Sequence, residues 1–179
     1  MTRLFSPLTR DALQSQGWRL ARLPDDLTLE ALRRAGASFK GTKYFDQHAS
    51  DTHERPFEGG DVSYRPGLMP ESLNRTYAEI STLLDDLNRL LPSGTTAALG
   101  SAAVYTWLLD DHHTRAGEWL LPSCFAWTLD GHRSSHLVVG AFGRTQPILV
   151  SPLPEGRGSG VGVMPLVVPV TLPVAYPVR

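Results

Sequence analysis

Two short segments of the chain carry imidazole and carboxylate side chains close enough together to bind a divalent metal ion. One segment, 46–61, is a loop rich in glycine and proline, and the other, 110–113, reads Asp-Asp-His-His after an apolar run. Histidine nitrogens and carboxylate oxygens are ligands that zinc and manganese accept. The two segments serve one ion only if folding brings them together. The candidate metal ligands are His48, Asp51, His53, Asp111 and His113.

The segment Asp110-Asp111-His112-His113 also resembles the Asp-His-His motif of the DHH phosphoesterases over four residues. The resemblance implies a strand end that presents carboxylate and imidazole groups to a divalent metal. That family also has aspartates after other strands of a doubly wound parallel sheet, on a longer chain. This sequence has neither an alternation of strands and helices nor an earlier Asp-x-Asp motif. A solvent-exposed hairpin turn at 110–113 is therefore the preferred interpretation.

Two other features suggest chemistry but have plainer interpretations. Cys124 is the single cysteine, which excludes an internal disulfide, and a lone cysteine in an apolar strand usually packs as a small hydrophobic side chain. The glycine-rich segment 154–162 contains Arg157 and could cradle a phosphate, but phosphate loops precede a helix. An extended proline-rich segment follows here instead. We therefore expect a flexible linker over 154–162.

The composition indicates one globular domain. The chain has 179 residues, of which 41% are hydrophobic, enough for a single core over 1–153 with a small helical subregion over 1–36. The net charge of −1 provides no basic surplus for binding nucleic acid, and no apolar run is long enough to span a membrane. We expect no nucleic-acid or membrane partner, and a cytoplasmic location or a place in a particle assembled in the cytoplasm.

The helices expected to support these segments follow from capping residues and apolar periodicity. Ser6 and Pro7 begin a helix that Gly17 ends, and Thr28 caps a second short helix that runs through Arg34. Apolar residues spaced by three and four predict one long amphipathic helix over 70–91. Its apolar stripe consists of Leu73, Tyr77, Ile80, Leu84, Leu87 and Leu91.

Strands dominate the rest of the expected fold. Apolar or alternating runs bounded by turn residues, among them Asp130-Gly131, indicate each strand. Consecutive strands joined by short turns form an antiparallel meander, and the stripe of the long helix would cover one face of it, which gives an α+β fold. The expected strands are 18–23, 43–45, 62–64, 103–109, 119–129, 136–142 and 147–150.

The C-terminal segment 163–179 has a pattern found nowhere else in the chain. Proline recurs at every fourth residue, at 165, 169, 173 and 177. These prolines exclude a helix, and in an extended strand all four would remove hydrogen-bond donors from the same edge. The alternate positions form an unbroken apolar face. The residues of that face are Leu166, Val168, Val170, Leu172, Val174 and Tyr176, with Val178 at its end.

A strand that is apolar on one face and blocked along one edge is suited to docking by strand addition. We therefore interpret the chain as a non-catalytic structural protein whose C-terminal arm docks on a neighbouring subunit, as arms do in oligomers, virions and other particles. The alternative for the arm is an ordinary edge strand of the chain's own sheet. The alternative function is a small metal-dependent hydrolase that uses loop 46–61 and turn 110–113, and a ligand-binding module is a third.

Overall fold

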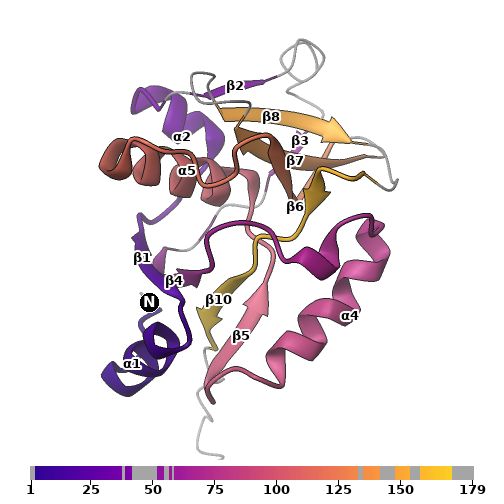
Figure 1. Ribbon diagram of the computed structural model, residues 1–179. Coiled ribbons are helices and arrows are strands. Elements are labelled where there is room, and N and C mark those ends of the chain that lie inside the picture. Colours follow the sequence, from indigo (N-terminus) through magenta and orange to yellow (C-terminus); the bar gives the residue numbers. More distant parts are fainter. Residues whose placement is uncertain are drawn as a thin grey trace, which may run out of the picture.

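The computed structural model describes residues 3–37, 39–41, 52–54, 57, 59–132, 135–141, 148–153 and 158–170. Within them the chain forms two β-sheets with helices packed against both (Figure 1). The helical elements are α1 (Pro7–Ser15), α2 (Leu29–Arg34), the 3-10 turn η2 (Pro70–Ser72), α4 (Tyr77–Asn88) and α5 (Ala102–Ala116). The strands are β1 (Arg19–Leu23), β2 (Phe39–Gly41), β3 (Thr52–His53), β4 (Gly60–Tyr64), β5 (Thr95–Ala98), β6 (Cys124–His132), β7 (Ser135–Ala141), β8 (Ile148–Leu153), β9 (Val161–Gly162) and β10 (Leu166–Pro169). No helix in this described part of the chain is long and apolar enough to cross a membrane.

The larger sheet has the strand order β2-β8-β7-β6-β3, with β9 beside β6. Strands β6, β7 and β8 follow one another in sequence and pair antiparallel, which confirms the later part of the expected meander but not its strand at 103–109. The smaller sheet has the order β1-β4-β10-β5 and is antiparallel throughout. The fold is α+β as expected, but it contains two sheets, and parallel pairs join β2 to β8 and β9 to β6.

The short N-terminal helices begin where capping residues predict them. The Ser6 hydroxyl accepts a hydrogen bond from the Thr9 backbone N–H at 3.1 Å, with Pro7 at the first helical position. The Thr28 hydroxyl accepts one from the Ala31 N–H at 3.0 Å. Each hydroxyl satisfies a backbone donor that has no partner within its own helix, so each fixes where the helix starts.

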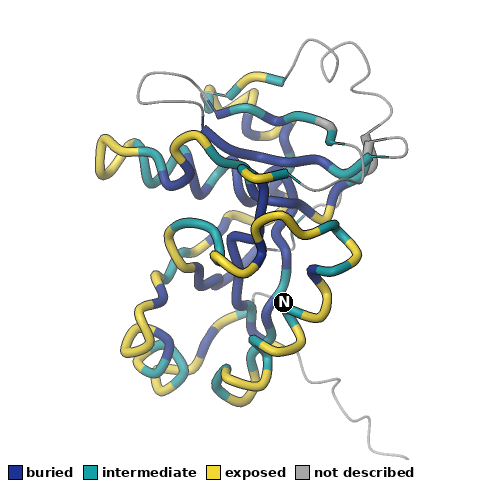
Figure 2. The backbone as a smooth tube through the Cα atoms, turned by 45° about the vertical axis from the view of Figure 1, so that its right-hand side comes forward, coloured by how far each residue is buried: buried dark blue, intermediate teal, exposed yellow. Residues whose placement is uncertain are grey.

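Helix α5 is the most deeply buried helix and connects the two sheets. The largest hydrophobic cluster contains its residues together with Val62 and Leu166 of the smaller sheet and Leu137 and Val139 of the larger one. Figure 2 shows the buried backbone gathered in the middle of the molecule and exposed backbone along the outer helices. The core therefore extends without interruption from one sheet to the other.

The strand expected at 103–109 and the turn expected at 110–113 are both wrong, because these residues belong to α5. The Ser101 hydroxyl accepts a hydrogen bond from Val104 N–H at 3.2 Å, and the Asp130 carboxylate accepts one from Ala102 N–H at 2.6 Å. Gly117, with φ of 71°, ends the helix. The N-terminal half of α5 is buried on nearly every side, so its apolar residues lack the 3.6-residue period by which an amphipathic helix is recognised.

The long helix expected over 70–91 is broken. The 3-10 turn η2 comes first, Asn74 has a left-handed φ of 58°, and α4 then begins behind a capping box formed by Thr76 and Glu79. Only the later part of the stripe packs as expected. Tyr77, Ile80 and Leu84 lie against Trp127 and Val138 of the larger sheet. Leu87 and Leu91 pack in a second cluster with residues of α1 and β10, whereas Leu73 lies outside the helix and is 36% exposed.

Two expected connections are strand instead. The Asp130-Gly131 turn lies within β6, at a shift of register against β7 between Trp127 and Gly131. The expected linker over 154–162 contains β9, which pairs parallel to β6. A Cβ atom on Gly162 would lie 2.6 Å from Ser72 Oγ, so this glycine permits close packing rather than flexibility. The strand expected at 43–45 lies outside the described residues.

The first part of the C-terminal segment is an interior strand of the chain's own fold. β10 pairs with β5 over Leu166–Pro169, but with β4 only at Leu166 and Val167. Val170 N–H donates to Gly94 O at 2.9 Å, on the β5 side. The alternation of donors therefore puts Pro165 and Pro169 on the β4 side, where pairing is confined to the two residues between them. The strand is thus neither a free arm nor an edge strand over these residues.

Candidate functional site

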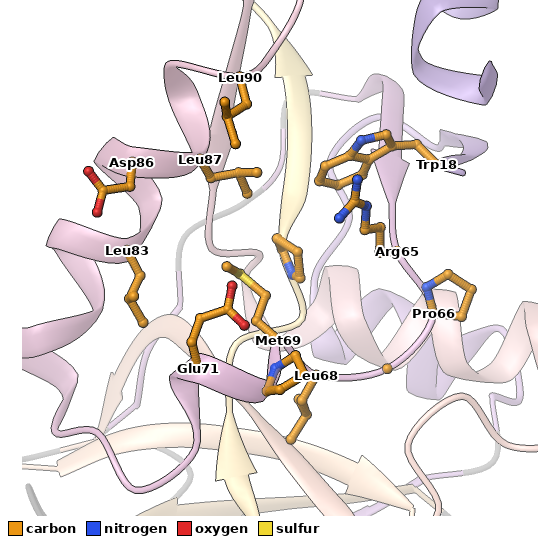
Figure 3. A pocket seen from close by; sticks show the side chains of 13 residues that line it. Trp18, Arg65, Pro66, Leu68, Met69, Glu71, Leu83, Asp86, Leu87 and Leu90 are labelled. Atoms are coloured by element: carbon orange, nitrogen blue, oxygen red, sulfur yellow. The ribbon is translucent and has the colours of Figure 1, made fainter. Parts of the chain in front are cut away.

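A cleft of about 430 Å³ lies between α4 and the segment 65–71, which leads from β4 to η2 (Figure 3). One wall is formed by Leu83 and Leu87 of α4 and by Leu90, which follows the end of that helix. The opposite wall is formed by Trp18 and by apolar residues of the connecting segment, with Pro165 also lining the cleft. The cleft is therefore mostly apolar, and its size is that of clefts that hold small molecules or a few residues of a peptide.

The segment 65–71 is fixed in place by the chain that enters β10. Met69 N–H donates to Val163 O at 2.8 Å, and Val163 N–H donates to Ser72 Oγ at 2.7 Å. The Ser72 hydroxyl in turn donates to Met69 O at 2.6 Å and is fully buried. These reciprocal bonds satisfy the backbone groups of both segments. The cleft wall is consequently built on a rigid contact with the core rather than on a free loop.

The charged groups of the cleft lie on opposite sides of it. The Arg65 guanidinium stacks over the Trp18 ring, 4.8 Å from the ring centre, and donates to Gln16 O at 3.2 Å. Glu71 and Asp86 lie across the cleft from this pair (Figure 3). Asp86 forms an exposed ion pair of 2.9 Å with Arg89, which solvent weakens. Arg89 thus partly neutralises Asp86, and Glu71 is left opposite the guanidinium of Arg65, an arrangement that suits an apolar ligand with a positive group beside Glu71.

The structure does not bring Asp111 and His113 to a common site. Asp111 forms an ion pair of 2.8 Å with Arg115, and the His113 ring stacks on Trp119 with centroids 3.8 Å apart. Residues two apart in a strand share a face, but in a helix they are separated by about 200° and point to opposite sides. The expectation that Asp111 and His113 serve one metal ion rested on a turn after a strand, and the structure has a helix there instead.

The other predicted metal ligands are not tested by the structure. His48 and Asp51 lie outside the described residues, and only the backbone of His53 is described, in β3 opposite Gly131. Among the residues with described side chains, no group of three histidine, cysteine, aspartate or glutamate residues could hold a metal. Metal binding by loop 46–61 stays a prediction.

His112, which neighbours these residues, belongs to a small cluster at the side of α5. Its Nδ1 lies 3.3 Å from the Arg19 guanidinium of β1. Burial, and next the positive charge of Arg19, lower the pKa of His112. Burial raises the pKa of Tyr64, which Arg19 partly offsets. The cluster joins α5 to the smaller sheet, and its surroundings favour the neutral form of the imidazole.

Two carboxylates, one fully buried and one half-buried, serve helix ends. Asp130 is fully buried and binds the first N–H of α5, as described above. Glu54 accepts a hydrogen bond from Leu29 N–H, the first of α2, at 2.5 Å. Burial raises the pKa of Glu54, the bond to Leu29 partly lowers it, and the charge of Asp130 raises it further. A carboxylate at a helix N-terminus is stabilised by the helix dipole, so both groups are structural.

Cys124 and the first arm residues also have structural positions. Cys124 is half-buried at the start of β6, and burial raises the pKa of its thiol, which opposes formation of a nucleophilic thiolate. Leu166 is buried in the chain's own core and Val168 packs against it, so neither is free to bind a partner. Val170 is 43% exposed. Leu172, Val174 and Tyr176 lie outside the described residues.

No local signal in the sequence indicates the cleft. Trp18 and Arg65 are far apart in the chain and become neighbours because β1 and β4 pair antiparallel with Arg19 opposite Tyr64. Compared with known protein families, with curated protein sequences and with solved structures, the chain matches none of them.

Proposed function

We propose that this chain is a non-catalytic assembly subunit whose residues beyond Val170 dock on a neighbouring subunit. The segment 171–179 continues the pattern of the buried strand β10, with prolines at 173 and 177 and apolar residues between them. In β10 that pattern is matched by packing on both faces, since Leu166 and Val167 belong to different hydrophobic clusters. The apolar side chains that continue this pattern in 171–179 therefore need a comparable apolar surface to pack against.

The observation that carries this proposal is that both neighbours of β10 end before residue 171. On one side, β5 begins at Thr95, and the Val170 N–H bond to Gly94 O comes after the last strand pair. On the other side, Arg3 bridges Gly60 of β4, and its carbonyl accepts the Asp61 N–H at 2.8 Å. Strand β4 therefore offers its edge to Arg3 where β10 would otherwise extend.

The apolar content of 171–179 favours docking energetically. Leu172, Val174, Tyr176 and Val178 alternate along it. Burial of a large apolar side chain contributes about 1.5 kcal/mol or more, so the four together contribute roughly 6 kcal/mol before the cost of ordering the chain. A binding free energy of about 6 kcal/mol corresponds to a dissociation constant on the order of tens of micromolar, and the cost of ordering the chain weakens it further unless most of the face is covered.

The test compares the full chain with a chain that ends at Val170, by size-exclusion chromatography with light scattering over a range of concentrations. We expect the full chain to assemble and the shortened chain to be a monomer with an unchanged thermal unfolding curve. A matched control keeps the length and replaces Leu172, Val174 and Tyr176 by serine, which should also give a monomer. A full chain that stays monomeric at all concentrations would overturn the proposal.

A further inference from the structure

We infer that the cleft between α4 and the segment 65–71 receives residues 172–179 of a second copy of this chain. This inference rests on the proposed function and names the surface on which the segment docks. Leu90, at the rim of the cleft, is 74% exposed, and it continues the apolar wall formed by Leu83 and Leu87. An exposed apolar wall beside a concave surface is characteristic of a peptide-binding groove.

The side chains of the segment fit the composition of the cleft. Residues 172–179 read Leu-Pro-Val-Ala-Tyr-Pro-Val-Arg, so all but the last are apolar or aromatic, and Arg179 carries the single charge. The lining of the cleft is mostly apolar, with the Glu71 and Asp86 carboxylates opposite Arg65. Arg65 itself is engaged by Trp18 and Gln16. Asp86 pairs with Arg89 at the surface, so Glu71 is the principal carboxylate that would attract the guanidinium of Arg179.

The volume of the cleft limits how much of the segment it takes. About 430 Å³ accommodates a few side chains rather than eight residues. Tyr176 is the largest side chain of the segment, and tyrosine is over-represented among residues that anchor protein interfaces. We place Tyr176 inside the cleft, with Leu172 and Val174 along its rim beside Leu90.

The geometry favours a second copy over the chain's own segment. Pro165, which lines the cleft, precedes β10, whereas the segment follows its other end at Val170. These two ends are separated by about 17 Å of strand, so the chain would have to reverse direction to reach its own cleft. Prolines at 173 and 177 favour an extended course instead. Nine extended residues reach roughly 30 Å, enough to meet a neighbouring molecule, and reciprocal exchange would give a two-fold dimer.

The experiment separates the cleft from the segment in full-length protein. Leu90→Asp removes the apolar rim of the cleft, and Tyr176→Ser removes the anchor of the segment. We expect each variant alone to raise the dissociation constant on the order of tenfold or more, measured by sedimentation velocity. The matched control is Leu8→Asp on α1, which is 82% exposed and lies outside the cleft. It should leave the dissociation constant unchanged.

Mixing the two variants tests docking between molecules. Leu90→Asp protein retains a complete segment and Tyr176→Ser protein retains a complete cleft, so an equimolar mixture should form heterodimers that neither variant forms alone. A charge exchange adds a second measurement: Arg179→Glu should weaken association, and combining it with Glu71→Arg and Asp86→Arg should restore it.

The outcomes distinguish this inference from the proposed function. If the wild type assembles and Leu90→Asp assembles equally well, the segment docks elsewhere, and only the assignment of the cleft is overturned. If the wild type is a strict monomer, both are overturned. If in that monomer Tyr176→Ser alters the fluorescence of Trp18, the segment occupies its own cleft, which also contradicts docking on a second copy.

Discussion

The larger sheet is built mainly from strands that follow one another in sequence, whereas the smaller sheet joins four segments from distant parts of the chain. Strands β6, β7 and β8 are consecutive. The smaller sheet places β10, near the end of the chain, between β4 and β5, and β1 pairs with β4 across 37 or more residues. Short turns connect the neighbouring strands β6, β7 and β8 of the larger sheet, whereas the smaller sheet forms only after long loops have closed.

This difference assigns two tasks to the C-terminal segment. Over 163–169 it completes the smaller sheet and buries Val163, Met164, Leu166 and Val167. Beyond Val170 the same sequence pattern has no vacant strand edge beside it within the described structure. The division between folding and the proposed assembly therefore lies inside one repeating pattern, near Val170.

The largest expected effect comes from removing β10. A chain that ends at Gly162 loses four buried side chains, which is about 6–12 kcal/mol of apolar burial and comparable to the whole stability of a domain. We expect it to show no cooperative thermal unfolding by circular dichroism, in contrast to the chain that ends at Val170. A cooperative transition in the shorter chain would mean that the smaller sheet does not depend on β10.

A single substitution in each sheet tests whether the two sheets unfold together. Leu166→Ala and Leu137→Ala each leave a cavity in the same hydrophobic cluster, and each should lower the free energy of unfolding by about 2–5 kcal/mol. Native-state hydrogen exchange of Leu166→Ala should accelerate in both sheets, because α5 joins them in one core. Acceleration confined to β1, β4, β5 and β10 would show that the smaller sheet opens separately.

Alanine substitutions along the apolar stripe expected over 70–91 should lower the free energy of unfolding by graded rather than equal amounts. Ile80 is almost fully buried, so Ile80→Ala should cost about 2–4 kcal/mol in urea unfolding. Leu84 is half-buried, so Leu84→Ala should lower the free energy of unfolding about half as much. Leu73 lies outside the helix, so Leu73→Ala should lower it by less than about 1 kcal/mol. Equal losses of stability in Ile80→Ala and Leu73→Ala would contradict the break at Asn74 and support one helix over 70–91.

The smallest expected effect is a pH dependence from Glu54. Its pKa is raised in the folded protein, mainly by burial, from the ordinary value of 4.5. The folded state therefore binds the proton more tightly, and the stabilisation is complete below about pH 4.5 and is lost as the pH rises through the folded pKa. Glu54→Gln keeps an acceptor for Leu29 N–H and should flatten this part of the stability profile. If Glu54→Gln leaves the pH dependence of stability unchanged, the Glu54 carboxyl group is exposed to solvent.

Part of the candidate site could be predicted and part could not. Of the leucines that line the cleft, only Leu87 belongs to the predicted apolar stripe, and the edge of β10 predicted to be blocked by proline pairs with β4 at Leu166 and Val167. No local signal joins Trp18 to Arg65, since their contact depends on the pairing of β1 with β4. The Asp130-Gly131 pair predicts a turn, whereas the Asp130 carboxylate accepts a hydrogen bond at the start of α5.

Helix α5 shows most clearly what the sequence determined and what tertiary structure decided. Local residues determine both of its ends: Ser101 caps its N-terminus and Gly117 terminates it. The sequence pattern nevertheless predicts a strand at 103–109. Burial between two sheets makes 102–109 apolar on nearly every side, so the apolar residues show no helical period. Local signals thus mark the two ends of α5, whereas the entry of Leu166–Pro169 into the core is decided by tertiary structure, because β4 and β5 leave strand edges open there.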